Sequence, residues 1–246
     1  MRASSLEFRL RMIIQVAIFV VGFVAPWIGP SNSARRVSTL AWLALEISRS
    51  GVASFALAAP MVIVLGSLAA LAGVVFRVWG AAYLSYDVVH QGQMQGGAVM
   101  VDGPYRYVRN PLYLGGWCLT VAMSLTMPPS GALFTLVMMT AHFLRLILGE
   151  EAFLSGKLGE PYREYLRSVP RLVPRLRPNL PRAGAHPQWL VALVSEVTAI
   201  GIFVAVAFLS WTYDNMLMIK VVVISFGVAL VVRAFMARRE AKSNTD

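Results

Sequence analysis

The chain has 246 residues, of which 57% are hydrophobic and only 14% are charged. Soluble domains carry about 25% charged residues, so this composition excludes an ordinary soluble enzyme and predicts a protein of the lipid bilayer. A net charge of +10 would suit a nucleic-acid-binding protein. However, the basic residues lie in loops between apolar runs, where anionic lipid headgroups are found. The single cysteine, Cys118, excludes an internal disulfide and any multi-cysteine metal site.

The first half of the chain begins with an apolar run over residues 12–29, close to the roughly 20 residues that a spanning helix needs. Arginines precede this run as in a signal peptide, but no small-x-small cleavage site follows, so we expect a retained first span. Residues 31–50 form a connector, part of which can lie as an interfacial helix. Residues 52–86 are too long for one simple crossing and predict a span kinked near Pro60 that continues past the interface.

The second half alternates polar segments with apolar pairs. Residues 87–110 are polar and glycine-rich, and residues 111–127 and 132–148 predict a helical hairpin around a Met-Pro-Pro-Ser-Gly turn. Residues 150–187 are polar, and a second hairpin follows over residues 189–211 and 217–236. The predicted fold class is therefore all-α, a polytopic transmembrane helical bundle of about six spans.

The distribution of lysine and arginine predicts the orientation. The segment 150–187 carries seven basic residues, the segment 87–110 carries Arg106 and Arg109, and neither hairpin turn carries any. Basic loops stay in the cytosol, so six spans place both termini and both central segments there, as in a bacterial inner-membrane protein. The connector 31–50, which carries Arg35, Arg36 and Arg49, is the one basic segment that this topology places outside. Two crossings within residues 40–86 would instead place both basic central segments outside, against the rule.

The densest chemical signal is residues 103–115, Gly-Pro-Tyr-Arg-Tyr-Val-Arg-Asn-Pro-Leu-Tyr-Leu-Gly. Asn110 suits a helix N-cap and Pro111 suits the first helical position. A helix that starts here at the membrane surface favours an anion at its free amides, while Tyr105, Tyr107 and Tyr113 offer aromatic faces to a cation such as a sulfonium. The alternative is an interfacial belt of aromatic and arginine side chains that anchors the helix.

Glu150 and Glu151 follow the apolar helix that returns from this hairpin. Two adjacent carboxylates at a membrane boundary repel each other, and they can simply be a solvated helix end. Hairpin geometry, however, brings Glu150 back to Asn110 and Tyr113. A carboxylate, a helix start and aromatic rings at one depth complement a zwitterionic amino acid attached to a cation.

Other polar residues give weaker signals. His142 lies in an apolar run and predicts an interhelical hydrogen bond, and His186 lies in a proline-rich loop. Glu196 lies in an apolar run, so we expect it to pair with an arginine of the segment 150–187 or to line a path through the bilayer. No metal-ligand spacing, phosphate loop or nucleophile elbow is present in the sequence.

The motif at 103–115, the apolar hairpin, Glu-Glu, and then Phe153-Leu154, Leu158-Gly159, Tyr162, Tyr165 and Val169-Pro170-Arg171 together resemble the isoprenylcysteine carboxyl methyltransferase and phospholipid methyltransferase superfamily. The resemblance covers roughly residues 74–175. It implies a single membrane-embedded methyltransferase domain over residues 1–246, with N-terminal spans over 1–73, a catalytic core over 74–175 and a C-terminal helical hairpin over 189–238.

The resemblance further implies that S-adenosylmethionine binds in a cytosolic pocket while a lipophilic acceptor arrives from the bilayer. Many members have histidine in place of Asn110, which keeps a hydrogen-bonding group but cannot titrate. Where the prenylcysteine enzymes bind the acceptor with an arginine, Arg145 is adjacent but one residue off. The implied catalytic residues are Tyr113 and Arg145, and the implied cofactor-binding residues are His90, Gly97, Ala98, Val99, Met100, Tyr105, Asn110, Pro111, Leu112, Tyr113 and Glu150.

Within this class the acceptor stays open between a small or lipophilic thiol, an amino-phospholipid headgroup and a prenylcysteine carboxylate. The expected partners are the bilayer and that acceptor, with no nucleic acid and no metal. The alternative to an enzyme is a membrane binding or transport protein in which the same Arg, Tyr and Glu side chains anchor helices. A transporter usually places its ionisable site near mid-membrane, whereas this set lies at one interface.

Overall fold

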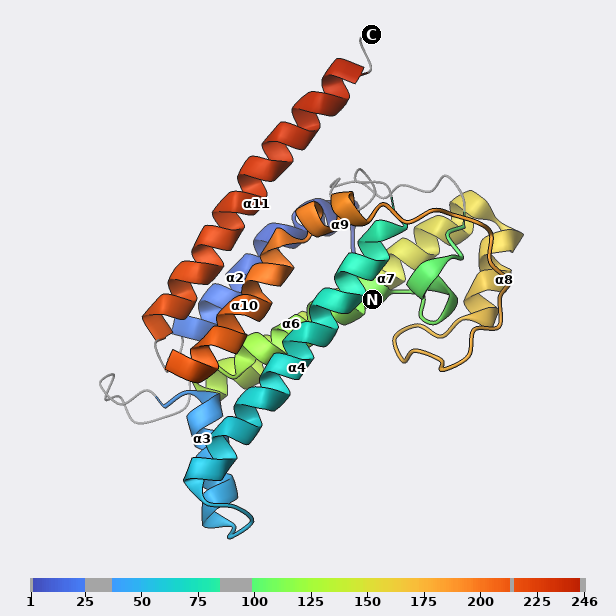
Figure 1. Cartoon of the computed structure of the whole chain (residues 1–246). Coiled ribbons are helices and arrows are strands. Elements are labelled where there is room, and N and C mark those ends of the chain that lie inside the picture. Colours follow the sequence, from blue (N-terminus) through green and yellow to red (C-terminus); the bar gives the residue numbers. More distant parts are fainter. Residues whose placement is uncertain (1, 25–36, 85–98, 213–214, 244–246) are drawn as a thin grey trace.

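The computed structural model describes residues 2–24, 37–84, 99–212 and 215–243, and within these ranges the chain is helical without strands. Figure 1 shows long helices running obliquely beside one another, with α8 and α9 at the upper end of the bundle and α3 at the lower end. The all-α prediction is confirmed. The elements are α1 (Ser5–Arg9), α2 (Arg11–Val24), α3 (Thr39–Arg49), α4 (Phe55–Ala82), η2 (Gly103–Arg106), α6 (Pro111–Ser124), α7 (Pro129–Leu158), α8 (Glu160–Ser168), α9 (Trp189–Ser195), α10 (Val197–Thr212) and α11 (Asn215–Ser243).

Two described helices, α4 and α7, are long and apolar enough to cross a membrane. The bent pair of α9 and α10 would be a third if it forms one span. The helix α2 and the apolar stretch Lys220–Val232 are shorter than a simple crossing requires. The chain is thus an integral membrane protein with two or three candidate spans among the described residues, and the count of about six stays a prediction.

Two helices differ in extent from the sequence prediction. Helix α4 is continuous through Pro60, which lies in its second turn, where the missing N–H removes few helical hydrogen bonds. Helix α7 extends to Leu158, ten residues beyond the predicted end at residue 148. No helix breaker intervenes before Gly159, whose φ of 66° ends the helix. The two glutamates therefore lie within α7 and not after it.

Small residues allow close contact between the helices. Gly73 of α4 faces Gly115 of α6, and a Cβ added to Gly115 would lie 2.7 Å from the Gly73 carbonyl oxygen and 2.6 Å from Arg77 Cγ. Gly22 of α2 and Gly131 of α7 face each other in the same way. Such glycine contacts are typical of helix pairs in membranes, where backbone proximity replaces the hydrophobic effect as the source of packing energy.

The final helices pack on this core through α10, which contacts both α4 and α6. Between α9 and α10 the chain bends by 65° at Glu196. The Glu196 carboxylate accepts hydrogen bonds from Arg77 Nε at 2.6 Å and Nη2 at 3.0 Å. The expected partner, an arginine of the segment 150–187, is wrong, since the partner is Arg77 of α4. The other expectation, that Glu196 lines a path through the bilayer, stays a prediction. Arg77 is the single charged residue of α4, and a buried carboxylate pairs with the cation that packing brings to it.

Residues 169–188, which we call the strap, run without helix from the end of α8 back to the start of α9 (Figure 1). Backbone and side-chain bonds hold the strap along its length. Asp102, just before η2, accepts the N–H groups of Ala183 at 2.9 Å and Ala185 at 2.7 Å. The other bonds join Arg109 N to Pro170 O, Arg175 N to Tyr107 O, the Arg106 guanidinium to Leu180 O, and Gln188 N to Ala82 O.

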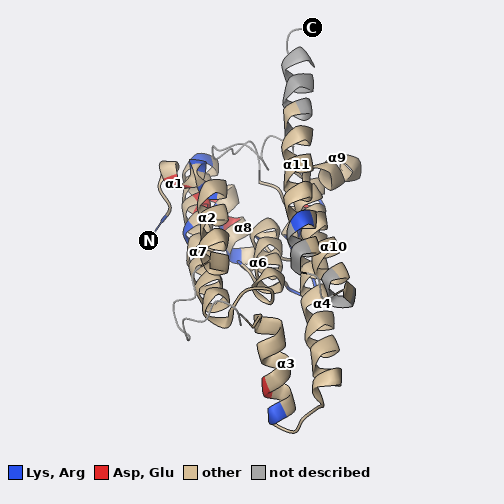
Figure 2. Ribbon diagram, turned by 90° about the vertical axis from the view of Figure 1, so that its left-hand side faces the viewer, with Lys and Arg blue, Asp and Glu red and all other residues tan. Residues whose placement is uncertain are grey.

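Charged residues are unevenly placed on the bundle. In Figure 2 the lower part of α4 is free of charge, whereas an acidic and a basic residue lie at the tip of α3. These are Glu46 and Arg49, which form an exposed ion pair at 2.8 Å. The helix α3 confirms that part of the connector 31–50 is helical. Residues 31–36 of that connector lie outside the described residues.

The contact between α4 and α6 predicts a sharp effect of one methyl group. We expect Gly115→Ala to lower the thermal stability in detergent, because overpacking costs about 1–3 kcal/mol. The matched control is Gly156→Ala in the last turns of α7, where an added Cβ meets nothing within 4 Å. Alanine should stabilise that position by roughly 0.5–1 kcal/mol. Similar melting temperatures for the two variants would contradict the packing described here.

The bonds at Asp102 predict a pH-dependent attachment of the strap. The N–H groups of Ala185 and Ala183 hold the pKa of Asp102 below its ordinary value, against the opposing effect of burial. Because the pKa of Asp102 is lower in the folded chain than in the unfolded chain, where it is about 3.9, the ionised carboxylate stabilises the fold at pH values above about 3.9. This stabilisation is lost as the pH falls through the pKa of the folded chain.

We therefore expect Asp102→Asn to lower the melting temperature at pH 7 and to increase tryptic cleavage after Arg182. The melting temperatures of wild type and variant should converge below about pH 4. Glu160→Gln, which removes only exposed ion pairs, is the control. A difference in melting temperature that persists unchanged in acid would show that the carboxylate charge is not what holds the strap.

Candidate active site

The start of α6 and the end of α7 meet at a hydrogen bond between Tyr113 and Glu150. The Tyr113 hydroxyl donates to Glu150 Oε2 at 3.1 Å. The Tyr113 ring packs edge-on against Phe143, with ring centroids 5.9 Å apart. Pro128 and Pro129 at the hairpin turn begin α7, and the antiparallel return of that helix sets the contact. The sequence prediction that Tyr113 and Glu150 converge is confirmed.

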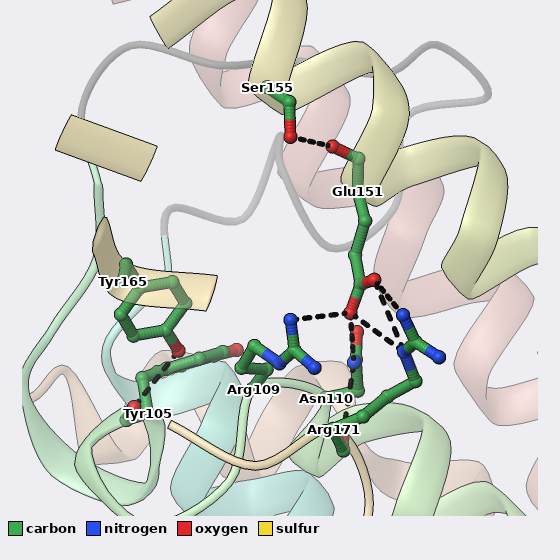
Figure 3. Close-up of polar contacts among 7 residues, drawn as sticks. All are labelled: Tyr105, Arg109, Asn110, Glu151, Ser155, Tyr165 and Arg171. Carbon is green, nitrogen blue, oxygen red and sulfur yellow. Dashed lines mark hydrogen bonds and ion pairs between the residues drawn. The ribbon is translucent and has the colours of Figure 1, made fainter. Parts of the chain in front are cut away.

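The neighbouring carboxylate, Glu151, is buried in a cluster of donors (Figure 3). Arg171 of the strap binds it through Nε at 3.2 Å and Nη2 at 2.8 Å. Arg109 Nη1 lies 3.5 Å from Oε1, and Asn110 Nδ2 donates to the same oxygen at 3.4 Å. A buried carboxylate is costly unless it is paired and hydrogen-bonded, and here two segments of the chain, the residues before α6 and the strap, supply its partners.

Asn110 occupies the N-cap position of α6, but its side chain makes no cap hydrogen bond. Its amide donates to Glu151 and to the carbonyl oxygen of Arg171 at 3.2 Å. The expectation that Asn110 caps the helix through its side chain is therefore wrong, because the buried carboxylate competes for its donor. The first-turn amides of Leu112 and Tyr113 consequently lack that cap, and the positive end of the helix dipole is left for another anion.

Arg109 adds a second indication at the same place. Its Nε is buried and has no hydrogen-bond partner within the described residues. Buried donors are nearly always satisfied. An unsatisfied guanidinium N–H beside an uncapped helix start fits a site for a ligand carboxylate.

Tyr105 lies on the far side of this cluster and is buried. Its hydroxyl donates to Gly80 O at 3.4 Å, and its carbonyl oxygen accepts the Tyr165 hydroxyl at 2.9 Å (Figure 3). Burial raises the pKa of Tyr105 and of Tyr165, so both phenols stay neutral. These contacts join η2 to α4 and α8, and they hold the backbone that leads into Arg109 and Asn110.

Arg145 also lies on α7, but its side chain faces α1. Its guanidinium binds the Glu7 carboxylate of α1 through Nε at 2.8 Å and Nη2 at 2.7 Å. His142 Nδ1 lies 3.8 Å from the same carboxylate. The bonds of Arg145 therefore tie the N-terminal segment to α7, and the structure does not join it to Tyr113 or Glu150.

The remaining predicted residues are only partly described. Pro111 is buried, and Leu112 packs against Gly80 of α4. Val99 lies against the cluster of Tyr162, Tyr165 and Val169, and Met100 is half-buried. His90, Gly97 and Ala98 lie outside the described residues. Across the ranges that the structure describes, no group of His, Cys, Asp or Glu side chains is placed to hold a metal ion.

Sequence reasoning expects positive charge from Arg106 and Arg109 beside the start of α6, but it missed the pairing of Arg109 with Glu151 and the roles of Arg171 and Asp102. Arg171 follows the Val-Pro pair of the strap, and nothing in its spacing shows that it returns to Glu151 across 20 positions. The one usable signal was Glu151 itself, since two adjacent carboxylates in a helix near the membrane require a cation for at least one of them.

Comparisons with known proteins agree with this geometry. A family model described as phospholipid methyltransferase matches residues 61–160, which span α4 to the first residue of α8. The protein-S-isoprenylcysteine O-methyltransferase of Schizosaccharomyces pombe is 38% identical over 78 residues, which cover 31% of this chain and 33% of that protein. The chain thus matches about a third of the length of this curated relative.

No solved structure shows a significant match. The two similarities, the motif at 103–115 and the paired glutamates of α7 agree on one assignment. Over residues 61–160 the chain is similar to the superfamily of integral membrane methyltransferases that contains the phospholipid methyltransferases and the isoprenylcysteine carboxyl methyltransferases, and this similarity indicates a methyltransferase.

Proposed function

We propose that the protein transfers a methyl group from S-adenosylmethionine to a lipophilic or small acceptor at the cytosolic surface of the membrane. The observation that carries this proposal is the contact of Tyr113 with Glu150 at the uncapped start of α6. It places an acceptor of hydrogen bonds, an aromatic face and free helix amides within one small region, which is the chemistry that a sulfonium-bearing amino acid requires.

The side chains fit the amino-acid part of this cofactor. Glu150 is half-buried and keeps a carboxylate for an ammonium group, while Glu151 beside it is neutralised by arginines. The amides of Leu112 and Tyr113, with the unsatisfied Nε of Arg109, suit a carboxylate. In this proposal Asn110 holds the helix start in place, and Pro111 fixes its direction. Tyr105 supports the backbone that leads into Asn110, and we retain His90, Gly97, Ala98, Val99 and Met100 as proposed cofactor-binding residues.

The bound cofactor supplies an electrophilic methyl group on a sulfonium. The task of the chain is then alignment, since displacement at that carbon depends mainly on the position of the nucleophile. Tyr113 donates to Glu150 and so fixes the carboxylate that orients the ligand. A carboxylate acceptor needs no base, whereas a thiol or an ammonium must first lose a proton.

The acceptor class follows from the membrane setting. The curated relative is named for methylation of an isoprenylcysteine, and the matching family model is named for phospholipids. Both names point to acceptors that reside in lipid. A prenylcysteine carboxylate would need a cation, and Arg145, the predicted candidate, is bound by Glu7. Arg145 could therefore bind an acceptor carboxylate only if its ion pair with Glu7 opens. A thiol or a phospholipid headgroup would not need this cation, so both stay alternatives to a prenylcysteine.

We further propose that about six spans place both termini and the segment 150–187 in the cytosol, within one domain. The basic strap supports this orientation, and the packing of α10 on α4 and α6 supports a single unit. Reporter fusions after residue 177 and after the C-terminus should both report the cytosol. An external signal from residue 177 would exclude a cytosolic cofactor site.

The function is tested by calorimetry with S-adenosylhomocysteine and by turnover with labelled S-adenosylmethionine. We expect binding by the purified protein and label transfer to at least one member of a panel of lipophilic thiols, amino-phospholipids and prenylcysteines. Failure to bind S-adenosylhomocysteine by well-folded protein would reject the proposal and leave a non-catalytic membrane protein.

The two adjacent glutamates predict different phenotypes. Glu150→Gln should weaken S-adenosylhomocysteine binding roughly ten- to hundred-fold, since a charge-assisted hydrogen bond contributes about 1.5–3 kcal/mol. Its melting temperature should stay near that of wild type. Glu151→Gln should instead lower the melting temperature, because Arg171 and Arg109 lose their buried partner. A reversed pattern would mean that Glu151 is the ligand-binding carboxylate.

A further inference from the structure

The strap carries an exposed segment in which apolar and basic residues alternate. Leu176 is 98% exposed and Val173 is 78% exposed. Arg175 and Arg177 flank Leu176 and are themselves exposed. We call residues 171–177 the basic-apolar loop. Leu176 contributes little to packing among the described residues, and two exposed apolar side chains among arginines suit a surface that is both apolar and anionic.

The loop is fixed beside a spanning helix. Arg175 N donates to the carbonyl oxygen of Tyr107 at 3.0 Å, and its guanidinium donates to Ser168 O at 2.9 Å. The Tyr107 ring packs against Trp79, with ring centroids 5.7 Å apart. Trp79 lies in the last turn of α4, and tryptophan at the end of a span sits at the headgroup level. These contacts place the loop at the level of the membrane–water interface.

The charge and the restricted backbone of the strap suit the membrane–water interface. The strap contains four arginines and no acidic residue. Arginines at a membrane surface are attracted to anionic headgroups. Pro170, Pro174 and Pro178 fix φ at three places, so little conformational entropy is lost when the loop binds. The pattern is that of a segment that lies on a membrane, with apolar side chains in the interface and cations on the phosphates.

We propose that the basic-apolar loop is a membrane anchor: Val173 and Leu176 insert into the headgroup region of the bilayer that the protein spans, and Arg175 and Arg177 bind anionic lipid phosphates. The anchor is independent of methyl transfer. It has a structural consequence, since Arg171 at the start of the loop binds Glu151. Lipid contact would therefore hold the strap against the residue next to Glu150.

The test uses the full chain with Cys118→Ala, so that one introduced cysteine carries an environment-sensitive fluorophore. Leu176→Cys is the reporter, and Gly156→Cys is the matched control. Gly156 has open space for a side chain. It also lies roughly 40 Å along α7 from Pro129, beyond a hydrocarbon core of about 30 Å. Both proteins are reconstituted in nanodiscs of neutral phosphatidylcholine, with and without anionic phosphatidylglycerol.

We expect the Leu176 probe to emit at shorter wavelength than the Gly156 probe and to be quenched by lipids that carry a spin label at the headgroup. Quenching should grow with the fraction of phosphatidylglycerol. Arg177→Gln should lower the ratio of lipid-bound to free loop roughly five-fold, and Arg182→Gln, on the part of the strap held by Asp102, should change that ratio little.

Three outcomes would overturn the proposal. A Leu176 probe that behaves as the Gly156 probe does would show a loop in water, and would leave a soluble protein as the partner. Equal quenching in neutral and anionic bilayers would remove the role of the arginines. Equal effects of Arg177→Gln and Arg182→Gln would assign the attraction to general surface charge and not to this loop.

Discussion

The arrangement of the site depends on the neutralisation of one buried carboxylate, Glu151. Its partners come from the residues before α6 and from the strap, so a single charge joins three segments that are distant in sequence. A buried charge that loses its partners is strongly destabilising, which gives these segments little freedom to separate. Because successive helical residues point about 100° apart, fixing Glu151 toward Arg171 also fixes Glu150 toward Tyr113.

A second buried ion pair holds the start of α6 from the opposite side. Arg77 of α4 binds Glu196 at the bend between α9 and α10, and it also donates to the carbonyl oxygen of Leu112 at 3.4 Å. The contact of Gly73 with Gly115 lies one turn further along the same helices. The start of α6 is thus held by two ionic clusters, Arg77 with Glu196 and Glu151 with its arginines. A ligand site needs such fixed supporting groups to keep one geometry.

The sequence predicted the helical class and the contact of Tyr113 with Glu150, because both follow from local patterns: apolar runs and the return of a hairpin. It did not predict the side-chain role of Asn110, the end of α7 or the partner of Glu196. Asn110 has the propensity of a cap, but the stronger demand of a buried carboxylate takes its donor. Arg77 could not be chosen among many arginines, since the choice depends on how α9 packs on α4. Such ion pairs form between helices that are distant in sequence, so they produce no periodic pattern in the sequence itself.

The two glutamates have different partners, arginines for Glu151 and the Tyr113 hydroxyl for Glu150, and this difference sets the charge pattern of the site. Glu151 carries one negative charge against two guanidinium groups, Arg109 and Arg171, so this cluster retains one positive charge beside the positive end of the α6 dipole. Glu150, on the next position of α7, contributes a negative charge a short distance away. In the proposed function, the positive end would face the carboxylate of the bound amino acid and Glu150 would face its ammonium. Without Arg171 the two carboxylates would repel each other, and the polarity that orients such a ligand would be lost.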